Sequence, residues 1–288
     1  MIADSHCHAW RVWPYDRRVP DPEHRGTVDA LLWQMDTHGV AHAAVVCARI
    51  GGGNDGAGFA NADNNAYVVD AARRYPHRLT AWVDVDSMWR AEHHTPGAAR
   101  RVADVLEETG APGVTHYVRP ENDGWFRSED GHAFVAEIAA RGAVLSLAAG
   151  AAWLPDVVEI ARRHPSLVVL LHHLGLPRQG RHREQDVNAV LTCAEVPNIG
   201  VKASGFHYND EPAWGYPYPA AQQLFQRLLD GFGPCRLLWG SDFPASRDLL
   251  TYRQSIEVVR AHAGLSTDEL DLVMGGNLDR LLRTGSLT

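Results

Sequence analysis

Short runs of β-forming residues alternate with helical segments along the whole chain of 288 residues. This alternation is typical of parallel β–α units, in which each helix returns the chain to the start of the next strand. Eight strands are predicted, at residues 2–8, 42–48, 79–85, 113–118, 143–148, 167–173, 198–203 and 235–240. Helices are predicted at residues 27–38, 62–74, 97–109, 130–141, 153–163, 184–194, 219–230 and 248–262, followed by a terminal pair at 266–274 and 277–283.

Eight β–α units make a closed (β/α)8 TIM barrel the simplest α/β architecture. We predict that residues 1–288 form one such domain, with short C-terminal helices. A doubly wound open sheet is the alternative, but it usually carries a glycine-rich phosphate turn after its first strand, and none follows residues 2–8. The long segments 49–61 and 208–220 are expected to wall a pocket at the carboxyl end of the barrel, the first as a mobile lid.

The composition narrows the class of protein. A hydrophobic fraction of 45% and a charged fraction of 22% are those of a globular protein, and no apolar run approaches the roughly 18 residues of a membrane helix. The net charge of -8 argues against non-specific binding of nucleic acid. The first residues do not resemble a secretory signal. We therefore expect a cytoplasmic protein whose partner is a small-molecule substrate, and a homo-oligomer is compatible with the sequence.

The most informative chemical signal is the pair His6 and His8 on the first predicted strand. Residues two apart on a strand lie on the same face, about 7 Å apart, so Cys7 between them points toward the helix layer. In a barrel the inward face points at the axis, where two imidazoles can bind one divalent ion at about 2.1 Å. An isolated pair of histidines is more often structural, and the interpretation therefore depends on partners elsewhere in the chain.

Two further strand ends supply such partners. The sixth predicted strand ends at His172 and His173, and the strand period of two lets only one of them point inward, for which we favour His173. Asp242 follows the eighth strand, at the carboxyl edge of the barrel where catalytic side chains gather. A carboxylate there can bind a metal ion or act as the general base toward water. The joint pattern is far more specific than any of its members.

These motifs resemble the amidohydrolase-related (amidohydrolase 2) family of the metal-dependent hydrolase superfamily, and are closest in pattern to its sugar-lactone and pyrone-dicarboxylate lactonases. The resemblance rests on residues 4–8 (Asp-Ser-His-Cys-His), 173–177 (His-Leu-Gly-Leu-Pro) and 238–244 (Leu-Trp-Gly-Ser-Asp-Phe-Pro). It implies that Asp242 deprotonates the attacking water. It also implies a site for one divalent metal ion, with Zn²⁺ the first choice, which in lactonase-like members is weakly held or absent. The implied catalytic and metal-binding residues are His6, His8, His173 and Asp242.

The chain departs from the wider superfamily at two strands. The fourth predicted strand, 113–118, offers no lysine for a carbamate that bridges two metal ions, and the fifth, 143–148, contains no histidine. A binuclear site is therefore not expected, and the choice is between one metal ion and none.

Five other residues near predicted strand ends are candidate substrate contacts. Lys202 could bind a substrate carboxylate or pack its stem in the barrel wall. The phase of the fourth strand decides whether His116 or its neighbour Tyr117 lines the pocket. Arg49 is a candidate anion anchor, or a solvated loop residue. Trp10 could stack on a ring substrate or seal the core.

The reaction expected first is water-mediated opening of a lactone or a related cyclic ester or amide, with Asp242 as the general base. A metal-dependent, non-oxidative decarboxylase of an aromatic or enoic acid would use the same four residues. A barrel that binds a ligand without turnover is the third possibility, and the intact constellation of histidines and aspartate argues against it.

Overall fold

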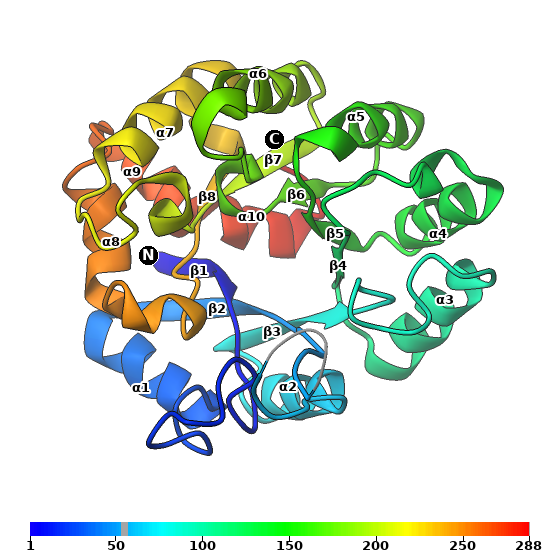
Figure 1. Cartoon of the computed structure of the whole chain (residues 1–288), viewed down its shortest axis with the longest axis horizontal. Helices are drawn as coiled ribbons and strands as arrows, with labels where there is room; N and C mark the ends of the chain where they lie inside the picture. The colour runs from blue at the N-terminus through cyan, green and yellow to red at the C-terminus, as the bar shows by residue number, and fades with distance from the viewer. Residues whose placement is uncertain (53–56, 288) are drawn as a thin grey trace.

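The structure, a computed structural model, describes residues 1–52 and 57–287, so the predicted lid lies partly outside the described residues. Eight parallel strands follow one another in chain order, each hydrogen-bonded to the next. Figure 1 shows them in a central ring, with the helices outside it. The predicted TIM barrel is therefore confirmed. The strands are β1 (Ile2–Cys7), β2 (Val40–Val46), β3 (Leu79–Asp84), β4 (Gly113–Tyr117), β5 (Val144–Ala148), β6 (Val169–Leu171), β7 (Ile199–Ala203) and β8 (Leu237–Trp239).

The helices follow the predicted order but begin and end where local capping dictates. Helix α8 begins at Tyr252, later than the predicted residue 248, because Thr251 and Gln254 form a capping box ahead of it. The helices are α1 (Val28–His38), α2 (Asn64–Arg74), α3 (Ala98–Thr109), α4 (Glu129–Ala140), α5 (Leu154–Arg163), α6 (Arg183–Thr192), α7 (Pro219–Phe232), α8 (Tyr252–Arg260), α9 (Thr267–Asp271) and α10 (Asn277–Thr284).

The ring closes where the segment after β8 runs beside β1. The backbone N–H of Asp242 donates to the carbonyl of His6 at 2.7 Å, and the N–H of His8 donates to the carbonyl of Phe243 at 2.6 Å. Gly240 makes this approach possible, because a Cβ at that position would lie 2.5 Å from the Cβ of His6. The closure itself therefore places Asp242 next to His6 on β1 and His8 directly after it.

Apolar side chains fill the barrel on both sides of its wall. Cys7 belongs to the larger cluster, which packs the strands against the outer helices, as its predicted outward direction requires. A smaller cluster inside the ring includes Val46, Trp82 and Leu170, and helix α10 adds Leu278 to it. In Figure 1 α10 (red) lies close to the central strands. No helix in the described part of the chain combines the length and apolar character needed to cross a bilayer.

Candidate active site

Four residues from distant parts of the chain meet at the carboxyl end of the barrel. The carboxylate oxygen Oδ1 of Asp242 lies 3.6 Å from Nε2 of His6 and 3.6 Å from Nε2 of His8. It lies 4.0 Å from Nε2 of His173. We call His6, His8, His173 and Asp242 the mouth cluster. The structure brings together all four residues that the sequence places in the candidate catalytic site.

Hydrogen bonds behind the imidazoles decide which nitrogen faces Asp242. Nδ1 of His8 lies 2.7 Å from the carbonyl of Val46, which can only accept, so this nitrogen carries the proton. Nδ1 of His173 contacts the hydroxyl of Ser204 at 3.1 Å. The buried Nε2 of His6 finds no hydrogen-bond partner among the described residues. The Nε2 atoms of the mouth cluster are therefore available as ligands that share one point.

Lys202 lies behind His6 and is the only lysine of the chain. Its buried Nζ lies 2.6 Å from Oγ of Ser146, 3.2 Å from Nδ1 of His6 and 4.3 Å from the centre of the Trp82 ring. Burial lowers the pKa of Lys202 well below its usual range, which favours the neutral amine. A neutral amine can accept a hydrogen bond from Nδ1–H of His6, and this leaves the lone pair of Nε2 directed at Asp242.

The prediction that only one of His172 and His173 points inward is wrong. Strand β6 ends at Leu171, and the backbone of His173 turns to a φ of 48°, so the alternation of a strand no longer applies. The rings of both histidines lie 4.5 Å, centre to centre, from the ring of His6. His173 faces Asp242, as expected. His172 is directed instead to the hydroxyl of Ser146, at 2.7 Å.

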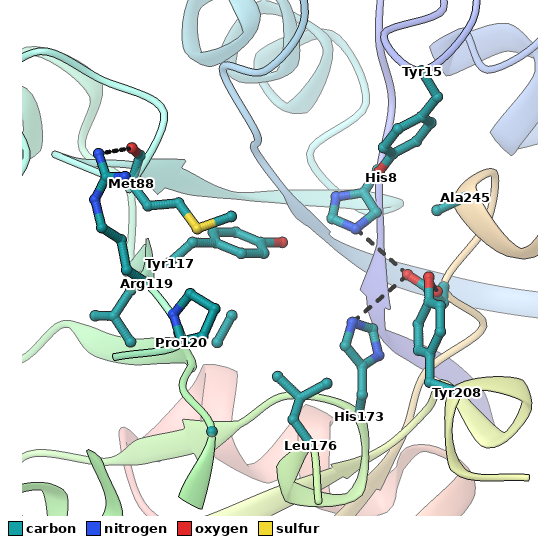
Figure 2. A pocket seen from close by; sticks show the side chains of 14 residues that line it. His8, Tyr15, Met88, Tyr117, Arg119, Pro120, His173, Leu176, Tyr208 and Ala245 are labelled. Atoms are coloured by element: carbon teal, nitrogen blue, oxygen red, sulfur yellow. Dashed lines mark hydrogen bonds and ion pairs between the residues drawn. The ribbon is translucent and has the colours of Figure 1, made fainter. Parts of the chain in front are cut away.

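A cavity of about 400 Å³ opens directly over the mouth cluster. Figure 2 shows His8, Tyr15, His173 and Tyr208 on one side of it and Met88, Tyr117, Arg119 and Pro120 on the other. The exposed Arg119 is the cationic side chain among the described residues that line it. The site therefore combines a polar wall, where the histidines and Asp242 lie, with a mostly apolar wall opposite, which is typical of a small-molecule site.

Tyr208 and His207 complete the surroundings of Asp242, and the sequence analysis did not assign either residue to the site. The hydroxyl of Tyr208 donates to Oδ2 of Asp242 at 2.9 Å, and Nε2 of His207 lies 3.9 Å from the same oxygen. Both residues lie in the 3₁₀ turn that follows β7, residues Phe206–Asn209. The available signal was their position, since side chains just after a barrel strand reach the carboxyl face.

The charge state of the mouth cluster follows from its surroundings. Burial opposes ionisation of Asp242, but the neighbouring His173 and His8 outweigh it, and the pKa of Asp242 falls to about 2. Burial lowers the pKa of His173 to about 4. Near neutral pH the Asp242 carboxylate is therefore ionised, as a group that accepts a proton from water must be. The His173 imidazole is neutral, as a metal ligand must be.

Of the predicted substrate contacts, Tyr117 lines the cavity and the other four are not among the described residues that line it. Trp10 is buried behind His8, with its ring stacked on the imidazole at 4.9 Å. The Arg49 guanidinium donates to the carbonyl of Ala62 on the other side of the loop. Lys202 reaches only the back of His6. These positions correct the prediction that Trp10, Arg49 and Lys202 contact the substrate, because each side chain contacts protein atoms away from the cavity.

His116 also lies away from the cavity. It sits on the outward face of β4, since Thr115 and Tyr117 take the inward face, and its ring packs against Phe134 of α4 and against Trp125. The period of two on this strand therefore selects Tyr117 as the residue that lines the cavity.

Fold and site together define a barrel hydrolase of the metal-dependent type, with a His-x-His pair at the end of β1, a histidine after β6 and an aspartate after β8. The family model described as Amidohydrolase (Amidohydro_2) matches residues 3–284, and the chain belongs to this family.

Relatives of known name or structure agree with this assignment. An L-fucono-1,5-lactonase of Burkholderia multivorans is 26% identical over 96% of this chain and 94% of its own. A crystal structure of an amidohydrolase from the same species with bound zinc superimposes with a TM-score of 0.73, 23% identity and coverage of 97% and 98% of the two chains. A probable 2-pyrone-4,6-dicarboxylic acid hydrolase of Acinetobacter baumannii, with citric acid bound, gives a TM-score of 0.74 at 21% identity, covering 98% of this chain and 99% of its own.

Proposed function

We propose that this amidohydrolase opens the ring of a lactone, with Asp242 as the general base. The observation that carries the proposal is the mouth cluster, in which Oδ1 of Asp242 lies within 4.0 Å of Nε2 of His6, His8 and His173, and from which His8, His173 and Asp242 line the cavity. Relatives named L-fucono-1,5-lactonase match nearly the whole chain and support a sugar lactone as the substrate class.

The mouth cluster fits one divalent metal ion. Its imidazoles offer unprotonated Nε2 atoms, the Nε2 of His6 is buried without a partner among the described residues, and Asp242 adds a carboxylate oxygen. Nitrogen and oxygen donors in this proportion are those that Zn²⁺ takes in catalytic sites. When bound there, the ion would supply polarisation of the lactone carbonyl and a lower pKa for water.

Asp242 moves the proton in the proposed reaction. Its carboxylate takes a proton from water as the water oxygen attacks the lactone carbonyl carbon. When the bond between that carbon and the ring oxygen breaks, Asp242 returns the proton to the departing oxygen, and the product is an open-chain hydroxy acid. The Tyr208 hydroxyl, 2.9 Å from Oδ2, holds the carboxylate so that Oδ1 faces the imidazoles and the reacting water.

The opposite wall of the cavity positions the substrate. Tyr117 and Met88 offer apolar surface to a sugar ring, and the Arg119 guanidinium, which also donates to the carbonyl of Met88 at 3.2 Å, can bind a substrate hydroxyl or carboxylate. Arg119 thus takes the role of anion anchor that the sequence analysis gave to Arg49.

A paired substrate panel tests the reaction class. The purified protein is incubated with a set of sugar 1,5-lactones and with a set of aromatic and enoic carboxylic acids, while acid release and CO₂ release are followed in parallel. We expect acid release from at least one lactone, slowed by about 100-fold or more in the Asp242→Asn variant and unchanged in the matched surface variant Asp70→Asn. Release of CO₂ from an acid without opening of any lactone would replace the proposal with a decarboxylase.

A further inference from the structure

A second group of histidines lies outside the mouth cluster and takes no part in the proposed reaction. His93 and His94 follow β3 in the segment before α3, and His116 lies on β4 with its ring turned toward the helices. One ring nitrogen from each lies within 4.8 Å of one from each of the others. We call His93, His94 and His116 the helix-side cluster.

Each Nδ1 atom of the helix-side cluster faces an oxygen that only accepts. Nδ1 of His93 lies 2.8 Å from the carbonyl of Asp86, and Nδ1 of His116 lies 2.8 Å from the carbonyl of Val85. Nδ1 of His94 lies 2.6 Å from Oδ2 of Asp123. A carbonyl or a carboxylate holds the proton on the nitrogen that faces it, so all of these imidazoles carry the proton on Nδ1.

The Nε2 atoms that remain are lone-pair acceptors, and those of His94 and His116 face each other. Nε2 of His94 lies 3.3 Å from Nε2 of His116, and the buried Nε2 of His93 has no hydrogen-bond partner among the described residues. With every Nδ1 protonated, a neutral cluster has no hydrogen to place between these nitrogens. Two lone pairs at this distance repel each other unless a proton or a metal cation lies between them.

We propose that the helix-side cluster binds a second divalent transition-metal ion, of the Zn²⁺ class, through Nε2 of His93, His94 and His116. Two nitrogens that each lie about 2.1 Å from a tetrahedral ion are about 3.4 Å apart, close to the 3.3 Å between His94 and His116. The carboxylate behind His94 and the carbonyls behind His93 and His116 are the outer partners that orient histidine ligands in zinc sites. This site is independent of the proposed lactone hydrolysis.

The contacts around His94 also hold its ring in one orientation, as a metal-binding histidine requires. Its ring is stacked between those of His93, at 3.7 Å, and Trp125, at 4.2 Å. Its backbone has a φ of 53°, a left-handed conformation that costs a non-glycine residue energy and that persists where surrounding contacts hold it. A bound ion would join the segment after β3 to β4, which assigns it a structural role.

Zinc titration of the full-length protein tests the proposal. Metal is first stripped with a chelator, and Zn²⁺ binding is then measured by calorimetry in a His8→Gln background, which removes one ligand from the mouth cluster. We expect this variant to bind one Zn²⁺ ion per chain. Adding His94→Gln, or separately His93→Gln, should weaken that binding by more than the 10- to 100-fold typical of outer-sphere changes. Adding His77→Gln, at an exposed histidine outside both clusters, should leave it unchanged.

Asp123→Ala provides a second measurement with a smaller expected effect. Loss of this outer partner of His94 should weaken Zn²⁺ binding by about 10- to 100-fold. The fold should be retained, because the Asp123 side chain is 49% exposed. Circular dichroism confirms that each variant is folded. The proposal is overturned if the His8→Gln protein binds no Zn²⁺, or if folded His8→Gln/His94→Gln protein binds it as tightly as the His8→Gln parent.

Discussion

The two histidine clusters of this barrel are built alike and placed differently. In both, oxygen acceptors behind the rings keep protons on Nδ1 of histidines such as His8 and His116, and Nε2 atoms converge in front. In the mouth cluster the carboxylate of Asp242 stands in front of the imidazoles and beside a cavity of about 400 Å³. In the helix-side cluster the carboxylate of Asp123 stands behind His94, and the ring of Trp125 stacks on His94 and His116. In the two roles proposed above, similar ligands serve catalysis only where a base and space for substrate adjoin them.

The largest expected difference between the clusters is in their carboxylates. Asp242→Asn should lower kcat by about 10²- to 10⁴-fold, the usual contribution of a general base. Asp123→Asn should change kcat by no more than about twofold, because substitutions at exposed positions away from the reacting atoms shift free energies by about 0.5 kcal/mol. Steady-state kinetics on the lactone identified by the panel measures both. Equal losses in the two variants would show that the clusters are coupled in the reaction.

Lys202 distinguishes the clusters through metal affinity. Lys202→Met keeps the length of the side chain but removes the amine that faces Nδ1 of His6, 3.2 Å away. Loss of such an outer partner should lower activity and Zn²⁺ affinity at the mouth cluster by about 10- to 100-fold and leave the helix-side cluster unchanged. Calorimetric titration of the variant, with His94→Gln added to isolate the mouth cluster, provides the measurement. Unchanged affinity there would mean that Lys202 is only a packing residue.

Tyr208→Phe removes a single hydrogen bond from Asp242 while the ring stays in place. Hydrogen bonds to charged groups contribute about 1.5 kcal/mol or more, so kcat/KM should fall by about tenfold. The matched control is Tyr216→Phe, a half-buried tyrosine on the same long segment that does not line the cavity. A loss of the same size in both variants would point to disturbance of the segment and not to the hydrogen bond with Asp242.

The last comparison between the clusters concerns thermal stability. Zn²⁺ at 100 times its dissociation constant stabilises a folded protein by about 2.7 kcal/mol, which in a chain of this size raises Tm by roughly 5–10 °C. In the Asp242→Asn protein, adding Zn²⁺ after chelation should restore most of this increase through the helix-side cluster. In His94→Gln the increase should be smaller. Scanning calorimetry with and without chelator separates the cases, and equal increases in wild type and His94→Gln would argue against a stabilising role.

The barrel and the core of its active site could be predicted because they depend on local patterns. Alternation of strand and helix signals specifies the order of the elements, and the spacing of His6 and His8 specifies their shared face. The same reasoning failed for His172, which also points inward, since β6 ends at Leu171 and a backbone φ of 48° at His173 replaces the strand geometry. The sequence could not decide whether His116 lines the cavity. Nearly all side chains of β4 are buried, so the strand lacks the alternation of apolar and polar residues that would identify its inward face.

The sequence alone determined the fold class, the mouth cluster and the family resemblance, because periodicity and strand ends dictate which side chains reach the carboxyl face of a barrel. Only the tertiary structure decided which side chains from different strands and loops contact one another. It alone placed Lys202 against His6, the Tyr208 hydroxyl against Asp242, and His93 and His94 against His116. Such contacts depend on loop paths and on tautomers set by distant oxygen atoms, and no spacing along the chain encodes either.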